Sequence, residues 1–364
     1  MLLGVIADDF TGATDIASFL VENGMRTIQV NGIPSEDMKI NADAVVVSLK
    51  SRSCSTQQAI IDSVKALKWL QSQGCQQFYF KYCSTFDSTA QGNIGPVTDA
   101  LLDQLNEDFT VVCPSLPVNG RTVFNGYLFV LGQLLSESGM RNHPVTPMKN
   151  SNVVQLMDAQ SRGETGLINY QIIEQGPDHI IKGFKALKAQ GKRYAVVDAF
   201  NSQHIDNIGK SISGLKLITG GSGLASGIAK NWQSHLQDQT EAKKAGYPSK
   251  APTVIFSGSC SLTTNKQVSH YIKKAPHLAI DVEHCLNKNN YSQEVCDWVL
   301  NQTQSTLAPL VYATADPQGL KKIQLEYGAE ASSQAVEDFL SNWPSSLRRK
   351  ESAILLLQVV RLQE

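Results

Sequence analysis

The chain has 364 residues, of which 42% are hydrophobic and 18% are charged, and its formal net charge is −1. That length predicts roughly two domains of about 150 residues each, with enough apolar residues for a core in both. The near-neutral charge argues against nucleic acid or an anionic membrane as a partner. A bound anion must therefore be held by a local group of donors.

The N-terminal run Met1–Ala7 leads straight into Asp8, without a basic region or a cleavage site. We expect a first strand here and not a signal peptide. No apolar run approaches the roughly 20 residues that cross a bilayer. The seven cysteines form no CxxC pair, and the seven histidines show no metal-ligand spacing. These patterns predict a cytoplasmic protein with reduced thiols and without a protein-built metal site.

Apolar strand-like runs alternate with helix-like runs through the first two thirds of the chain. The first helix is expected just after Gly12, because Ala13, Ile16, Ala17 and Leu20 share one face and Asn23-Gly24 is typical of a helix end. This alternation predicts an α/β fold with a largely parallel sheet. The expected strands are 3–7, 27–30, 44–49, 78–80, 109–112, 194–197 and 215–218.

A polar stretch with two prolines separates this region from a second α/β set, which has expected strands at 253–256 and 309–314. We therefore predict two domains, each a largely parallel sheet flanked by helices. The first spans 1–240, a linker spans 241–252, and the second spans 253–364 and is expected to be incomplete.

Polar side chains gather where the expected parallel strands end, which is where such sheets form their sites. Asp8, Asp9 and Thr11 lie between the first strand and the first helix, where carboxylates can grip sugar hydroxyls or accept a proton. A simple helix cap is the alternative interpretation. Arg52 and Lys81, with Lys50, follow two other strands and together predict a pocket for a carboxylate or phosphate.

The loop after the strand at 78–80 carries Ser84, Thr85 and Asp87, which can ring a polyol with donors and acceptors. Asp87 is a candidate general base, and an ordinary surface aspartate is the alternative. Arg121 follows an Asn-Gly turn that is expected to be structural, and its side chain could face the ligand.

Two glycine-containing loops follow strands later in the chain. Thr219–Gly223 has the look of a phosphate loop, but it fits neither GxGxxG nor GxxxxGK[ST], and close helix packing explains its glycines equally well. Without GxGxxG after the first strand, a dinucleotide-dependent oxidoreductase is disfavoured. The loop Ser257, Gly258 and Ser259 has hydroxyls suited to a phosphate or ribose, and it lacks the pattern of a serine nucleophile.

Taken together, several segments resemble the four-carbon acid sugar kinase family, and within it the 3-oxo-tetronate 4-kinases. The resemblance runs from residue 1 to about Trp343 and is carried by GVIADDFTGATDIASFLVENGM, SLKSRS, FYFKYCSTFDST, GNIGPVTDAL, PVNGRTVFNGYLFV, HPVTPM, AQSRGETGL, TGGSGL and FSGSCS.

The resemblance implies an N-terminal acid-sugar-binding domain, a C-terminal nucleotide-binding domain, and transfer of the ATP γ-phosphoryl group to the terminal hydroxyl of a four-carbon sugar acid. It implies that the Asp8-Asp9 loop, Arg52, Lys81 and the segment 84–87 line the acid-sugar pocket, and that the loop 257–259 touches ATP. Mg²⁺ would arrive with ATP and needs few protein ligands. The base (Asp9 or Asp87), the tetronate stereoisomer and a homodimer stay open.

The end of the chain departs from the family pattern, which continues into a glycine-rich nucleotide loop, GGETSG. Codons that encode Leu355 to Glu364 can be chosen so that a reading frame two bases later encodes IIAGGETSG. We therefore expect a frameshift near Pro344 that places 344–364 out of frame, with little or no ATP turnover. A natural divergent tail is the alternative, and a non-catalytic acid-sugar-binding remnant is the alternative function.

Overall fold

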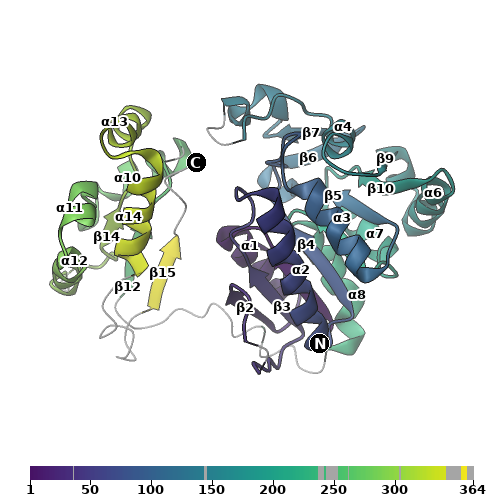
Figure 1. Cartoon of the computed structure of the whole chain (residues 1–364), viewed down its shortest axis with the longest axis horizontal. Helices are drawn as coiled ribbons and strands as arrows, with labels where there is room; N and C mark the ends of the chain where they lie inside the picture. The colour runs from purple at the N-terminus through teal and green to yellow at the C-terminus, as the bar shows by residue number, and fades with distance from the viewer. Residues whose placement is uncertain are drawn as a thin grey trace. The chain divides into compact units, whose positions relative to one another are not determined.

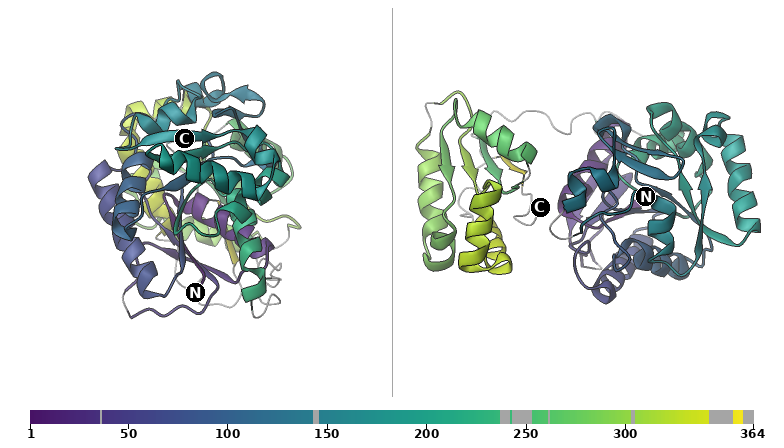
Figure 2. Two further views of the ribbon diagram at one scale, coloured as in Figure 1. Left: turned by 90° about the vertical axis from the view of Figure 1, so that its right-hand side faces the viewer. Right: turned by 90° about the horizontal axis from the view of Figure 1, so that it is seen from above.

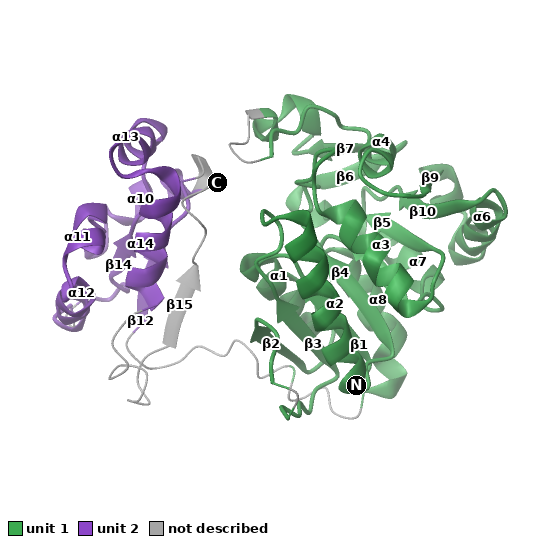
Figure 3. Cartoon of the chain, in the orientation of Figure 1, with its two compact units in different colours: residues 1–246 green, residues 247–364 purple. Residues whose placement is uncertain are grey.

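The computed structural model describes residues 1–35, 37–142, 146–236, 242, 253–260, 262–302, 305–341 and 354–358. The chain divides into two compact units, residues 1–246 and 247–364, which are green and purple in Figure 3. The predicted linker at 241–252 lies outside the described residues apart from Ala242, so its limits stay a prediction.

Unit 1 is built on an eight-stranded sheet with the order β2-β3-β1-β4-β11-β5-β10-β9, and the register of every neighbouring pair is parallel. All seven predicted strands of this region are present, with ends shifted by up to two residues. The strands are β1 (Leu3–Ala7), β2 (Thr27–Asn31), β3 (Ala44–Ser48), β4 (Gln77–Lys81), β5 (Thr110–Cys113), β9 (Glu164–Ile168), β10 (Lys192–Val197) and β11 (Leu217–Gly220).

Helices cover both faces of this sheet (Figure 1; Figure 2). They are α1 (Phe10–Glu22), α2 (Thr56–Ser72), α3 (Ile94–Leu105), α4 (Val153–Asp158), α5 (Tyr170–Glu174), α6 (Pro177–Ala189), α7 (Ser202–Ser211) and α8 (Leu224–Trp232). Short 3-10 turns are η1 (Pro117–Asn119), η2 (Leu135–Glu137), η3 (Gly139–Asn142) and η4 (Gln233–His235). Buried side chains of α2 and α3 form one core cluster with the sheet, and those of α1, α6, α7 and α8 form the other.

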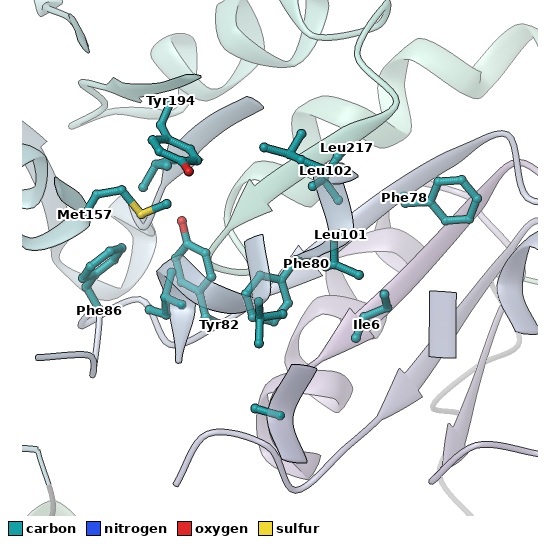
Figure 4. Packing of buried hydrophobic residues seen from close by; sticks show 14 of the residues in the cluster. Ile6, Phe78, Phe80, Tyr82, Phe86, Leu101, Leu102, Met157, Tyr194 and Leu217 are labelled. Carbon is teal, nitrogen blue, oxygen red and sulfur yellow. The ribbon is translucent and has the colours of Figure 1, made fainter. Parts of the chain in front are cut away.

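The core beneath the loop that follows β4 is aromatic. Phe80, Tyr82 and Phe86 pack edge to face, with ring centroids 5.6 Å and 5.5 Å apart. Figure 4 shows these rings within the buried cluster that also holds Tyr194 and Met157. Such aromatic packing adds to the burial energy. It anchors the loop that carries Thr85 and Asp87 onto the sheet.

A small antiparallel sheet, β6 (Arg121–Phe124), β7 (Tyr127–Val130) and β8 (Gln133–Leu134), was not predicted from the sequence. Its first turn is Asn125-Gly126, and both residues have positive φ (49° and 77°), as a tight hairpin requires. The buried Asp198 carboxylate, just after β10, accepts hydrogen bonds from the amides of Asn125, Gly126 and Tyr170 at 2.7–2.9 Å. Asp198 thus ties the hairpin to the main sheet.

An ion pair joins the starts of β2 and β3. The carboxylate of Asp43 accepts hydrogen bonds from the amide, Nε and Nη2 of Arg26 at 2.9–3.1 Å. Burial alone would raise the pKa of Asp43, but these hydrogen bonds and the charge of Arg26 lower it. The stability that this pair contributes is therefore present at neutral pH and is lost as the pH falls through the lowered pKa.

We expect Asp43→Asn to reduce the free energy of unfolding by about 1.5–3 kcal/mol at pH 7, the range for hydrogen bonds to a charged group. The deficit should begin to shrink below about pH 4, where Asp43 of the unfolded parent chain binds a proton, and should be lost once the pH falls through the lowered pKa of Asp43 in the folded chain. Urea titrations at the two pH values measure both effects. Asp37→Asn, at an exposed position, is the matched control. A deficit that is equal at both pH values would contradict the assigned ion pair.

Unit 2 contains a four-stranded sheet with the order β13-β14-β12-β15, in which all pairs are parallel. Its strands are β12 (Thr253–Ser257), β13 (His277–Ala279), β14 (Leu310–Tyr312) and β15 (Ile354–Gln358), and its helices are α10 (Leu262–Tyr271), α11 (Val282–Asn287), α12 (Tyr291–Leu300), α13 (Pro317–Tyr327) and α14 (Ala329–Ser341). Both expected strands of this region are present. The predicted out-of-frame segment 344–364 lies outside the described residues except for β15, and the frameshift stays a prediction.

Candidate active site

The strand order of unit 1 brings the predicted polar side chains together at one edge of the sheet. Strand β1 lies between β3 and β4, and all three run in the same direction. The residues that follow them therefore meet: Asp8 and Asp9 after β1, Arg52 beyond β3, and Lys81 at the end of β4. The amides of Ser51 and Arg52 both donate to the carbonyl oxygen of Asp8, which fixes the loop after β3 against β1.

Arg52 lies at the centre of this group and contacts three carboxylates. Its Nε and Nη2 atoms donate to the two oxygens of Asp8 at 2.9 Å each, a two-pronged pair. Nη2 also lies 2.9 Å from Oδ1 of Asp9, and Nη1 lies 3.9 Å from Oδ2 of Asp87. Burial raises the pKa of Asp8, the charge of Arg52 opposes this, and the neighbouring Asp9 reinforces it. In this structure Arg52 thus holds three acids together, and its role in binding an anion stays a prediction.

Asp9 has two functions at the start of α1. Its Oδ1 atom accepts the amide of Gly12 at 2.9 Å, so the capping interpretation of this motif is correct for Asp9. The same oxygen lies 2.9 Å from Nη2 of Arg52, while no hydrogen bond reaches Oδ2 among the described residues. Capping thus leaves one oxygen of Asp9 available. Thr11 is exposed on the first turn of the same helix.

The loop after β4 places Asp87 beside this group. Thr85 donates to Oδ1 of Asp87 at 2.6 Å, and the Sγ atom of Cys83 lies 2.8 Å from the Thr85 hydroxyl. Burial raises the pKa of the Cys83 thiol to about 12, so the thiol stays protonated at neutral pH. Phe86, which lies between Thr85 and Asp87, has a φ of 50°, and its buried ring fixes the turn.

Two other predicted residues, Ser84 and Arg121, lie outside this network. Ser84 lies beside Gly221, where a Cβ on the glycine would come 3.4 Å from the Cα of Ser84. Arg121 donates from Nη1 to the carbonyl oxygen of Asn119 at 2.6 Å, and no described contact joins it to the acidic residues. Their role in binding stays a prediction.

The glycine-rich loop after β11 makes close backbone contacts with the end of β5. A Cβ on Gly220, Gly221 or Gly223 would lie 2.4–2.7 Å from the carbonyl oxygens of Cys113, Pro114 and Ser115. Close packing therefore accounts for these glycines without a bound phosphate. Ser222 in this loop donates to the carboxylate of Asp15 on α1, a link that the sequence did not indicate.

We expect Gly220→Ala to destabilise unit 1 by about 1–3 kcal/mol, because its Cβ would meet the Cys113 carbonyl oxygen at 2.4 Å and the Tyr79 hydroxyl at 2.7 Å. Urea unfolding measures the change. Gly214→Ala is the matched control, since no atom lies within 4 Å of the added carbon there. Equal stability of the two variants would contradict the packing role of the loop.

In unit 2 the predicted nucleotide loop is joined to the loop after β14. The hydroxyls of Ser257 and Thr314 lie 2.7 Å apart, and Nδ2 of Asn265 donates to the carbonyl oxygens of Cys260 and Ala315 at 3.0 Å each. Both loops follow parallel strands, so Ser257, Gly258 and Ser259 lie at the sheet edge where ligands bind in such folds. Asn265 and Thr314 are additions that sequence reasoning did not assign.

Comparison with known proteins fits both units. Residues 3–228 match a family described as sugar-binding N-terminal domain, and residues 254–357 match one described as nucleotide-binding C-terminal domain. A 3-oxo-tetronate kinase of Brucella melitensis is 59% identical over 93% of this chain and 78% of its own length. One of Pectobacterium atrosepticum is 58% identical over 92% of this chain and 80% of its own length.

The chain belongs to the 3-oxo-tetronate kinase family. This membership confirms the predicted family and the two-domain α/β fold. A solved Haemophilus influenzae protein also has this fold, with a TM-score of 0.75 and 53% identity over 95% of this chain and 83% of its own. The acidic residues around Arg52 lie within the segment that matches the sugar-binding family. The loop that begins at Ser257 lies within the segment that matches the nucleotide-binding family.

In the part of the chain that the structure describes, no helix is long and apolar enough to cross a membrane. In the same residues, no group of three or more histidine, cysteine, aspartate or glutamate side chains is arranged to hold a metal ion.

Proposed function

We propose that this chain transfers the γ-phosphoryl group of ATP to the terminal 4-hydroxyl of a four-carbon sugar acid such as 3-oxo-tetronate. The observation that carries the proposal is the convergence of Asp8, Asp9, Arg52, Lys81 and Asp87 at one sheet edge of a chain from this family. Acidic groups suit the hydroxyls of such a substrate, and a cation suits its carboxylate. Thr11, Ser84, Thr85 and Arg121 are proposed to complete the pocket.

The chemistry needs one proton acceptor in unit 1. The O4–H proton passes to a carboxylate, O4 forms a bond to the γ-phosphorus, the bond between that phosphorus and the β–γ bridging oxygen breaks, and ADP leaves. We propose Asp9 as the acceptor, because no hydrogen bond reaches its Oδ2 atom among the described residues, while both oxygens of Asp8 accept from Arg52. Asp87 is the second candidate, since only Oδ1 is engaged at short distance.

ATP is proposed to bind at the carboxyl ends of β12 and β14, on the loop Ser257, Gly258 and Ser259. The joined hydroxyls of Ser257 and Thr314 and the bare backbone at Gly258 fit a phosphate or ribose. Mg²⁺ would enter bound to the phosphates of ATP, which demands few protein ligands. A homodimer stays a prediction.

The test is ADP release from the purified chain with ATP, Mg²⁺ and 3-oxo-tetronate, beside a version in which the reading frame is restored from Pro344 onward. In the restored version we expect ADP release that depends on 3-oxo-tetronate. In the unaltered chain we expect little ADP release if the frameshift prediction is correct. Release in both versions would show that the altered tail is compatible with catalysis. Release in neither would overturn the substrate assignment.

The alternative function is a non-catalytic acid-sugar-binding remnant. It would be favoured if the printed chain binds 3-oxo-tetronate in a calorimetric titration and releases no ADP. The coding DNA tests the frameshift itself, since codons incompatible with the shifted reading would exclude it.

A further inference from the structure

Strand β2 forms one edge of the eight-stranded sheet, as Figure 1 shows, and its only neighbouring strand among the described residues is β3. Natural proteins usually protect such an edge with a covering element, a charge, a proline or a bulge. The opposite edge is protected in this way, because α4 packs against β9 and the amide of Thr165 donates to the Asp158 side chain at 2.8 Å. The sequence of β2, Thr-Ile-Gln-Val-Asn, contains no charge and no proline, and its register with β3 is regular.

The backbone of β2 offers hydrogen-bonding groups on this open side. The carbonyl oxygen of Arg26 accepts from the first amide of β3, and the amide of Gly32 donates to the carbonyl oxygen of the last residue of β3. Backbone direction alternates along a strand, so the odd-numbered residues Thr27, Gln29 and Asn31 turn their amides and carbonyl oxygens outward. No hydrogen bond to these outward groups occurs among the described residues.

This open side is complementary to a second copy of itself. In an antiparallel pair, opposite residues alternate between those that exchange two hydrogen bonds and those that exchange none. With Gln29 opposite Gln29 of the other copy, Thr27 lies opposite Asn31, and these outward-facing residues form the hydrogen-bonded pairs. Every outward amide and carbonyl oxygen of the strand then has a partner. A pairing centred on another residue would leave some of them without one.

The side chains of β2 fit the same arrangement. Ile28 is 41% exposed and would lie opposite Val30 of the other copy, in the non-hydrogen-bonded pairs where side chains come closest. Two such apolar pairs form, one on each side of the axis. Gln29 brings no charge to the axis, and Thr14 of α1 donates to its Oε1 atom at 2.9 Å, which holds the side chain against α1.

We infer that β2 is a homodimer interface, in which two copies of the chain pair their β2 strands antiparallel about a two-fold axis at Gln29 and join their sheets. The strand supplies its own complement, as a two-fold interface requires, and this favours a second copy over an unrelated extended peptide. The dimer does not depend on the reaction that the chain catalyses, so this inference and the proposed function can fail separately.

Sedimentation velocity of the full chain at micromolar concentration tests the interface, and we expect a dimer. Gln29→Pro removes one outward amide, which an edge strand tolerates because that amide is not part of the ladder with β3. We expect its dimer dissociation constant to rise about 10-fold or more, since the two hydrogen bonds at the axis are lost and the proline ring meets its own copy. Circular dichroism and urea unfolding check that the variant folds.

A charge exchange at the same position tests the two-fold axis. Gln29→Lys and Gln29→Glu each place like charges opposite one another, so each chain alone should be monomeric. An equimolar mixture of the two brings opposite charges together and should restore a dimer. Gln190→Lys and Gln190→Glu, at an exposed position after α6, are the matched controls and should dimerise as the parent does.

Three results would overturn the inference. The first is a parent chain that stays monomeric at micromolar concentration, and the second is a dimer that none of the Gln29 variants weakens. The third is a pair of charged variants that are monomeric alone and do not associate when mixed, because this would exclude an axis at Gln29. If Gln29→Pro does not fold, the two charged variants decide the question.

Discussion

Arg52→Met is expected to destabilise unit 1 by about 3 kcal/mol or more at pH 7, the cost of leaving buried charges without their partner. Asp8 and Asp87 are 4% and 9% exposed, and together with Asp9 they would repel one another without the guanidinium. Urea unfolding, followed by hydrogen exchange of peptides from β1 and β4, reports the change in unit 1. Binding of the acid should be lost with it.

The loss should depend on pH in a defined direction. Burial raises the pKa of Asp8, and the charge of Arg52 opposes this rise; without Arg52 the folded-state pKa of Asp8 rises further, so the folded variant takes up a proton and its deficit shrinks as the pH is lowered. Arg141→Met, at an exposed position, is the matched control, and it should stay within about 0.5 kcal/mol of the parent. An Arg52→Met chain as stable as this control would contradict the neutralising role of Arg52.

Asp9→Asn is expected to lower kcat by about 100-fold or more, the range for removing a general base, with little effect on stability. Asparagine caps a helix about as well as aspartate, so the hydrogen bond from the Gly12 amide should survive. The exchange therefore removes the proton acceptor and keeps the local structure. ADP release under the conditions given above measures kcat in the version that turns over.

The same measurement of kcat on Asp87→Asn separates the two candidate bases. A large loss in Asp87→Asn together with near-parent activity in Asp9→Asn would transfer the role to Asp87. Asp178→Asn, at an exposed position of α6, is the control for replacing an aspartate by an asparagine and should leave kcat unchanged. A stability loss in Asp9→Asn equal to that of Arg52→Met would show that the carboxylate is structural.

The strand ends of the main sheet could be predicted because their signals are local. Runs such as Leu3–Ala7 and Ala44–Ser48 are continuous apolar segments, as strands buried on both faces require. A parallel sheet then gathers the residues after its strands at one edge, which predicted the meeting of Asp8, Arg52 and Lys81. The strand order itself, with β11 between β4 and β5, depends on packing between distant segments.

The pairing within the site could not be predicted. Arg52 and Asp8 are 44 positions apart, and no sequence pattern says whether an arginine at a strand end faces a ligand or a neighbouring acid. The links of Ser222 to Asp15 and of Ser257 to Thr314 join residues that are 207 and 57 positions apart. The β6–β7 hairpin is different, because Asn125-Gly126 between Phe124 and Tyr127 is a strong local hairpin signal and is enough to predict the turn from the sequence.

The most direct test is a crystal structure of the full chain soaked with 3-oxo-tetronate, which needs no turnover. We predict the acid at the sheet edge beyond β1, β3 and β4, with its carboxylate within hydrogen-bond distance of Lys81 Nζ and its 4-hydroxyl near Oδ2 of Asp9. Arg52 should keep its pair with Asp8. An acid bound at another edge, or a carboxylate seated on Arg52 with the acids displaced, would contradict this assignment of the site.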